Sequence, residues 1–162
     1  MTLLSDVLAG LADDFSIARH IDRGGVVSGV VLDSRRVRPA VTGQILTVFG
    51  CGGDRDRAKR PIMGRIAAEL SDQIIITTDN PRTEDPDQII TEIIAGATEY
   101  GHRVRAIPDR TQAISAALAA ASPGDLVLIA GKGSETYQIV GHTKIPYSDE
   151  IAVLSLTSDG AA

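Results

Sequence analysis

The chain has 162 residues, 43% of them hydrophobic and 23% charged, which suffices for one ordinary hydrophobic core of about 100 to 150 residues and a short additional segment. The aromatic content of 3% and the net charge of −5 argue against base-stacking platforms and against nonspecific binding to nucleic-acid phosphates. A single cysteine excludes an internal disulfide framework. The acidic first 20 residues do not form a signal peptide, and no stretch reaches the roughly 18 apolar residues of a membrane helix. We therefore expect a cytoplasmic protein.

The first part of the chain reads as a short helix-strand appendage. We expect an amphipathic helix over residues 3–11 and a strand over residues 26–32. Pro39 and Gly43 then mark a boundary, because both residues interrupt regular structure. The predicted units are residues 1–40 and 41–162.

From about residue 44 onward, strand-like apolar runs alternate with segments of helical spacing. The expected strands cover residues 45–49, 73–77, 103–107 and 125–130. The expected helices cover residues 62–70, 87–97 and 110–121, the last two opened by Pro86 and Asp109. This alternation predicts an α/β fold, a Rossmann-like three-layer domain in which helices cover both faces of a mostly parallel sheet.

The end of the chain departs from the alternation. Residues 137–142 and 144–147 flank a turn near Gly141 and predict a C-terminal hairpin. A final short helix is expected over residues 149–156.

A glycine-rich loop with many charges follows the first strand of the alternating region, within residues 47–61 (TVFGCGGDRDRAKRP). Its glycines let backbone N–H groups approach a ligand closely, and a helix that begins near Pro61 adds the positive end of its dipole, so the loop can bind an anion. The basic residues expected around the same opening are Arg55, Arg57, Lys59 and Arg60. The alternative interpretation is a glycine turn with a solvated basic face.

Two further loops leave carboxyl ends of strands in the predicted parallel sheet, where ligands of such folds bind. They are residues 78–82 (TDNPR) and residues 131–135 (GKGSE). With the glycine-rich loop they would bring these residues to one edge: Arg55, Asn80, Arg82, Lys132, Ser134 and Glu135. Cations for carboxylates and an acid for an ammonium group complement an amino acid with an extra carboxylate. The alternative is internal pairing, of Arg82 with Asp79, Glu84 or Asp85 and of Glu135 with Lys132.

These segments resemble the UDP-N-acetylmuramoyl-peptide synthetases, the Mur ligases, of the MurE type that adds the third amino acid of the peptidoglycan stem. The resemblance runs from residue 43 to about residue 150 and covers that family's C-terminal domain, through TVFGCGGDRDRAKRP, TTDNPRTEDPDQII, IPDRTQAI and LIAGKGSETYQIVGHTKIPYSD. A shorter resemblance, over residues 29–39 (GVVLDSRRVRP), is to the family's first domain, which holds the UDP-sugar substrate.

In that family the DNPR motif marks enzymes that select meso-diaminopimelate, and its arginine holds the distal carboxylate. The resemblance therefore implies that Asn80 and Arg82 bind such a ligand, with Arg55 on a carboxylate. It further implies that Gly131 and Glu135 bind the distal amino-acid group. The expected partner is an amino dicarboxylate small molecule.

The central ATPase domain of a full-length Mur ligase has no counterpart in this sequence. The family binds ATP and magnesium there, whereas no G-x-x-x-x-G-K-[ST] phosphate loop occurs in these 162 residues. We therefore expect no cofactor within this chain, no metal site and no independent ligation, so that a separate nucleotide-binding partner would have to supply the missing domain. Ser134 is a second departure, because the family usually has histidine at this position.

Two other classes of function stay open on the sequence. One is a repurposed enzyme that acts on an amino-acid-like substrate without ATP. Its candidate groups are His20, His102, His142 and Cys51, the last as a nucleophile whose pKa nearby arginines would lower. Cys51 can instead be a small residue that fills the tight glycine turn. The other class is an interaction or regulatory partner of a complete ligase.

The strand expected at residues 26–32 needs a partner, because an isolated strand leaves backbone groups unpaired. It can add to the sheet of the second unit or be exchanged between two copies of the chain. We expect a homodimer through residues 1–40 rather than a free tail.

Overall fold

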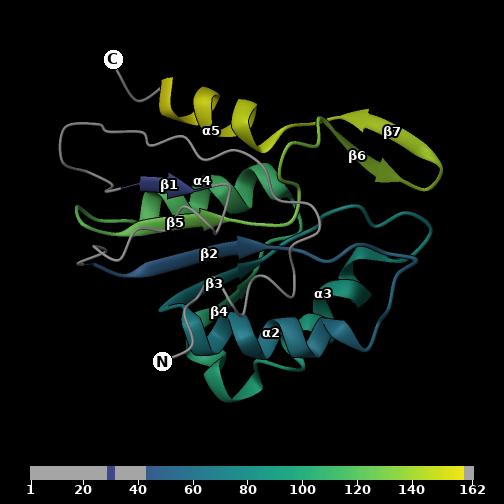
Figure 1. The fold of residues 1–162 in the computed structure, drawn as a ribbon, viewed down its shortest axis with the longest axis horizontal. Helices are drawn as coiled ribbons and strands as arrows, with labels where there is room; N and C mark the ends of the chain where they lie inside the picture. The colour runs from purple at the N-terminus through teal and green to yellow at the C-terminus, as the bar shows by residue number, and fades with distance from the viewer. Residues whose placement is uncertain (1–28, 32–42, 159–162) are drawn as a thin grey trace.

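The computed structural model describes residues 29–31 and 43–158, which form a five-stranded sheet with helices on both faces (Figure 1). The expected helix at residues 3–11 lies outside these residues. The strands are β1 (Gly29–Val31), β2 (Ile45–Phe49), β3 (Gln73–Ile76), β4 (Val104–Ala106) and β5 (Leu126–Ile129). Their spatial order is β1-β5-β2-β3-β4 and every pairing is parallel, which confirms the predicted α/β class.

The helices divide between the two faces of the sheet and produce the predicted three layers (Figure 1). They are α2 (Lys59–Leu70), α3 (Pro86–Ile94), α4 (Arg110–Ala120), α5 (Asp149–Ser158) and the 3-10 helix η2 (Thr98–Arg103). Helices α2 and α3 cover one face, and α4 and α5 cover the other. None of the helices among the described residues has the length and apolarity needed to cross a membrane.

Residues at alternate positions of β2 and β3 contribute to the two apolar layers of the core. Val48 and Val127 are fully buried beneath α4, whereas Ile76 is fully buried beneath α2 and α3. A side chain of this size contributes about 1.5 to 3 kcal/mol when it is fully buried. Strands β2, β3 and β5 are therefore nearly continuous apolar runs, as expected for a parallel sheet with both faces covered.

Helix boundaries follow local capping signals. The Asp85 carboxylate accepts a hydrogen bond from Asp87 N at 3.0 Å, and the Asp109 carboxylate accepts one from Gln112 N at 2.8 Å. Both are N-caps that satisfy an otherwise unpaired backbone donor of the first turn. The predicted starts at Pro86 and Arg110 are thereby confirmed.

Two helix limits differ from the prediction by three residues each. Helix α2 begins at Lys59 rather than at residue 62, and the helix expected to run to residue 97 ends at Ile94. The second difference arises where α3 meets the start of α2. A Cβ atom on Gly96 would lie 1.8 Å from the carbonyl oxygen of Pro61, so the chain approaches α2 so closely there that only glycine fits.

Strand β1 lies in the same sheet as the rest of the described chain. It pairs with β5 in parallel register, with Val30 opposite Val127. One of the two predicted solutions for the strand at residues 26–32, addition to this sheet, is thus seen at residues 29–31. The remainder of that predicted strand lies outside the described residues, and the unit boundary at residue 40 stays a prediction.

The predicted hairpin consists of β6 (Tyr137–Val140) and β7 (Thr143–Pro146), paired antiparallel around a turn that contains Gly141. It extends beyond the carboxyl ends of the sheet strands (Figure 1). The loop after β3 adds to it through a backbone bridge between Arg82 and Val140. The hairpin therefore attaches to one of the loops in which the sequence predicts a site.

Candidate functional site

The loops after β2, β3 and β5 meet at the carboxyl edge of the sheet, as the sequence predicts. Gly53 N donates to the carbonyl of Asn80 at 2.8 Å and so joins the first loop to the second. Asn80 Nδ2 donates to Glu135 Oε2 at 2.8 Å and so joins the second loop to the third. Side chains from distant parts of the sequence therefore share one small region.

The glycine-rich loop lies directly against the loop after β3. A Cβ atom on Gly53 would lie 1.9 Å from the carbonyl oxygen of Pro81, which no side chain could accommodate without moving the backbone. Gly53 thus allows the two loops to approach each other. Anion binding by this loop stays a prediction.

Asn80 lies at the centre of the region, with 5% of its surface exposed. Its Oδ1 atom accepts hydrogen bonds from Lys132 Nζ at 3.0 Å and from Ile139 N at 2.9 Å. Lys132 is 1% exposed and also contacts Asp79 Oδ1 at 3.2 Å and Glu135 Oε2 at 3.1 Å. The pairing of Glu135 with Lys132, which the sequence indicates as the alternative to ligand binding, is therefore confirmed.

Arg82 is held by its backbone in the left-handed region, with φ of 50°. Its N–H donates to the carbonyl of Ile139 at 3.0 Å, and its carbonyl accepts from Gly141 N at 2.7 Å. Its Nη1 donates to the carbonyl of Gly53 at 2.6 Å. Within the described part of the chain, no ion pair joins Arg82 to an acidic residue, so the alternative of internal pairing is not seen there.

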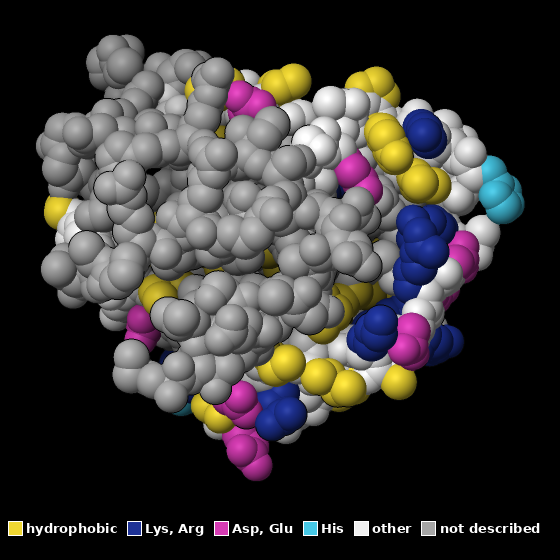
Figure 2. Space-filling model, in the orientation of Figure 1, with side chains coloured by type: hydrophobic (Ala, Val, Ile, Leu, Met, Phe, Trp, Pro, Cys, Tyr) yellow, Lys and Arg dark blue, Asp and Glu magenta, His cyan; other side chains and the backbone are white. Residues whose placement is uncertain are grey.

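The remaining predicted site residues lie at the margin of this cluster. Arg55 is exposed, and its Cγ lies 3.5 Å from the position that a Cβ on Gly52 would occupy. Gly131 has φ of 113°, which favours glycine, and lies beside the carboxylate of Asp79. Ser134 is exposed. Figure 2 shows Lys and Arg side chains gathered at the end of the molecule toward which the strands point in Figure 1.

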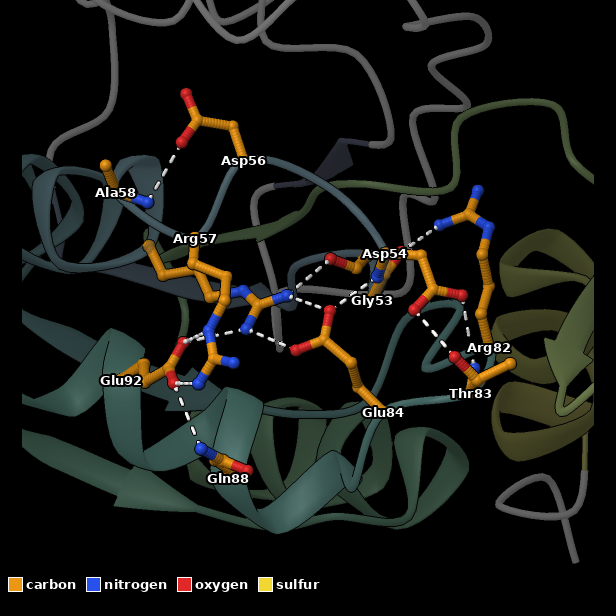
Figure 3. A network of polar contacts seen from close by, with 12 residues as sticks. Gly53, Asp54, Asp56, Arg57, Ala58, Arg82, Thr83, Glu84, Gln88 and Glu92 are labelled. Atoms are coloured by element: carbon orange, nitrogen blue, oxygen red, sulfur yellow. Dashed lines mark hydrogen bonds and ion pairs between the residues drawn. The ribbon is translucent and has the colours of Figure 1, made fainter.

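The expectation that all four basic residues of the glycine-rich loop stand around one opening is wrong for Arg60. Its side chain is 1% exposed and pairs with Glu84 at 2.8 Å and with Glu92 at 2.7 Å. Its Nη2 also donates to the carbonyl of Gly52 at 3.2 Å. Arg57 and Glu92 face each other as a further ion pair (Figure 3). Arg60 is buried because Glu84 and Glu92, on other elements, neutralise it.

These contacts shift the pKa values of the acidic groups. The hydrogen bond from Arg60, helped by the backbone N–H of Asp54, lowers the pKa of Glu84 to about 2. Hydrogen bonds from Arg57 and Arg60 also lower the pKa of Glu92. Both carboxylates are therefore charged at neutral pH, and the network they form clamps the glycine-rich loop to α3 and to the loop after β3.

The sequence hypothesis of a reactive Cys51 thiolate is wrong in its electrostatics. Burial, followed by the negative charge of Asp79, raises the pKa of the Cys51 thiol to about 12, and these effects outweigh the opposing effect of Arg60. Cys51 is 7% exposed, and its sulfur lies 3.5 Å from that of Met63. It packs as a small apolar residue, which was the structural alternative.

The expected absence of a cofactor and of a metal site in this chain stays a prediction. Within residues 29–31 and 43–158, no group of three or more His, Cys, Asp or Glu side chains is arranged to hold a metal ion. The sequence carries no phosphate loop of the G-x-x-x-x-G-K-[ST] kind. His102 and His142 are exposed. No catalytic role is assigned to any of these residues.

Comparisons with known proteins agree on one family. A family model described as Mur ligase, glutamate ligase domain, matches residues 30–133. A UDP-N-acetylmuramoyl-L-alanyl-D-glutamate--2,6-diaminopimelate ligase of Synechococcus sp. (strain WH7803) is 49% identical over 88% of this chain and 28% of its own length. The enzyme of the same name from Brucella melitensis is 52% identical over 72% of this chain and 23% of its own length.

A solved structure of a ligase of this name has a TM-score of 0.71 to the present fold and 43% sequence identity, over 75% of this chain and 25% of that one. The chain therefore spans about a quarter of the length of these relatives. The family match begins at residue 30 and so includes the last two residues of β1 as well as the glycine-rich loop. On this evidence the chain belongs to the Mur ligase family, through its glutamate ligase domain.

Proposed function

We propose that this chain binds an amino dicarboxylate of the meso-diaminopimelate kind and is related, in the cytoplasm, to the synthesis of peptidoglycan precursors. The observation that carries the proposal is that two loops, one with a guanidinium group and the other with a carboxylate, are joined by a hydrogen bond. Arg82 and Glu135 come from two loops that Asn80 joins directly. The relatives are named as diaminopimelate ligases, which supports the same ligand class.

Each predicted site residue has a role in this proposal. Arg82 and Arg55 would bind carboxylates, because a guanidinium group donates paired hydrogen bonds to a carboxylate. Glu135 and the backbone of Gly131 would bind the distal amino-acid group. Asn80 would connect the part of the site that binds carboxylates with the part that binds the distal amino-acid group.

Replacing Arg82 by alanine is expected to weaken binding of meso-diaminopimelate about ten- to hundred-fold, because a charge-assisted pair contributes roughly 1.5 to 3 kcal/mol. Titration calorimetry measures the change. The control is Arg65→Ala, which removes an exposed arginine of α2 that pairs only with Glu69 among the described residues. Equal affinity of wild type and Arg82→Ala, or no heat with either, would show that the site assignment is wrong.

We further propose that the chain alone is not a ligase and that a separate nucleotide-binding partner would be needed for ligation. Formation of the acyl phosphate requires ATP and a cradle for its β and γ phosphates. The 162-residue chain is expected to release no ADP in the presence of UDP-muramoyl dipeptide, meso-diaminopimelate and magnesium. ADP release that depends on the amino acid, from a preparation free of host ligase, would contradict this. A complete ligase serves as the positive control.

The homodimer expected through residues 1–40 stays a prediction, since most of those residues lie outside the described ones. In the structure β1 pairs with β5 of the same chain, which is the alternative to strand exchange between two copies. Light scattering on the full chain tests the point. A dimeric mass that persists at low micromolar concentration is expected, and a monomeric mass would contradict exchange between copies.

A further inference from the structure

Lys132 is a fully buried cation that the proposed ligand contacts do not use. Its side chain has no exposed surface, and its ammonium group donates to three acceptors, on Asp79, Asn80 and Glu135. A buried ammonium is tolerated only when it is paired and hydrogen-bonded. Because the group is enclosed, it acts on a ligand only through the side chains that surround it.

Lys132 fixes the orientation of the Asn80 amide. The amide oxygen faces two donors, Lys132 Nζ at 3.0 Å and Ile139 N at 2.9 Å. The amide nitrogen is therefore turned the other way, where it donates to Glu135 Oε2 at 2.8 Å. A flipped amide would place an N–H group against two other donors, so the contacts allow one orientation.

The same two residues anchor one oxygen of Glu135. Lys132 Nζ and Asn80 Nδ2 both donate to Oε2, at 3.1 Å and 2.8 Å. Within the described part of the chain, no hydrogen bond reaches the other oxygen, Oε1. The Glu135 side chain is 29% exposed, so that this carboxylate is open to a solute while Lys132 is not.

The charges of this cluster favour a cationic group. One ammonium, on Lys132, faces two carboxylates, on Asp79 and Glu135, which leaves one negative charge without a partner in the cluster. A positively charged group of a ligand would balance it. Hydrogen bonds to such charged groups are roughly twice as strong as neutral ones.

We propose that Lys132 is a positioning residue for ammonium recognition: with Asn80 it holds Glu135 by Oε2 and so presents Oε1 to the distal ammonium group of the ligand. The inference rests on the proposed amino-dicarboxylate function. It extends that function because it attributes to Lys132 and Glu135 the discrimination between ligands with and without that amino group. Without Lys132, repulsion between Asp79 and Glu135 would displace the Glu135 carboxylate.

The experiment compares two ligands, meso-diaminopimelate and 2-aminopimelate, which has both carboxylates and lacks the second amino group. Wild type is expected to prefer meso-diaminopimelate by about tenfold or more. Lys132→Gln and Glu135→Gln are each expected to reduce that ratio to about one, and the double variant to reduce it no further. A purely structural role of Lys132 would instead weaken both ligands equally and leave the ratio unchanged.

The matched control is Asp79→Asn, which keeps an oxygen acceptor for Lys132 but removes one negative charge of the cluster, so it is expected to reduce the preference less than Lys132→Gln does. A preference lost in Glu135→Gln and kept in Lys132→Gln overturns the positioning role alone. Wild type that binds neither ligand overturns the proposed function and this inference together. These two failures are therefore distinguishable.

If Lys132→Gln does not fold, the ammonium group can be observed directly by NMR in wild type. A buried, hydrogen-bonded Lys132 ammonium is expected to exchange slowly enough to give a ¹H–¹⁵N signal, and Glu135→Gln is expected to shift it. A signal unaltered by Glu135→Gln would overturn the proposal.

Discussion

Replacing Arg110 by leucine is expected to lower the free energy of unfolding by about 3 to 5 kcal/mol, because it leaves a buried carboxylate without its partner. Arg110 Nε and Nη2 donate to the two oxygens of Asp149 at 2.7 Å and 2.8 Å, and Nη2 also donates to the carbonyl of Ala130 at 2.9 Å. The two side chains are 0% and 1% exposed. Since domains of this size are stable by about 5 to 15 kcal/mol, the loss is a large share of the total.

Urea denaturation followed by circular dichroism measures the effect. The informative control is the double replacement Arg110→Leu with Asp149→Leu, which removes both charges and is expected to recover most of the loss. Arg110 Nη1 is buried without a hydrogen-bond partner among the described residues, so the native pair already carries an unsatisfied donor. A free energy of unfolding of Arg110→Leu within about 1 kcal/mol of the wild-type value would contradict this account of how α4 is joined to α5.

Replacing Arg60 by methionine is expected to cost about 2 to 3 kcal/mol at neutral pH, less than the loss at Arg110. The Arg60 side chain is buried, but Glu84 and Glu92 are 19% and 24% exposed, so water partly solvates the carboxylates that would be left behind. Arg65→Met, at an exposed ion pair of the same helix, is the matched control and is expected to change stability by less than 1 kcal/mol.

The same variant is expected to change the dependence of stability on pH. Arg60 lowers the pKa of Glu84 from 4.5 to about 2, so the native state gains stability from this carboxylate above pH 4.5 and loses it as the pH falls toward 2. In Arg60→Met this part of the acid dependence should be smaller. Urea midpoints measured between pH 2 and pH 7 test it, and parallel pH profiles of the two proteins would contradict the assigned cause.

The elements that local signals define could be predicted from the sequence. Strand β2 has the predicted limits, and Asp109 caps α4 as its position before an alanine-rich segment indicates. The meeting of the three loops could also be predicted, because a parallel α/β sheet places the carboxyl ends of its strands at one edge. The contact between Asn80 and Glu135 follows from that topology.

What could not be predicted is which charged residues the fold encloses. Arg60 stands in an alternation of basic and acidic residues typical of a solvated surface, and its burial depends on Glu84 and Glu92, which local periodicity does not connect to it. Lys132 follows a strand directly and reads as a loop cation, yet its side chain has no exposed surface. Both outcomes are set by tertiary neighbours.

The backbone conformation of Arg82 lowers the stability of the native state. A non-glycine residue at φ of 50° costs roughly 1 to 2 kcal/mol relative to an ordinary conformation, and glycine would avoid that cost. Position 82 nevertheless carries one of the longest side chains, whose guanidinium reaches the glycine-rich loop. The native state therefore gives up conformational free energy to keep an arginine there, and ligand binding by Arg82, if the proposed function holds, would account for that loss.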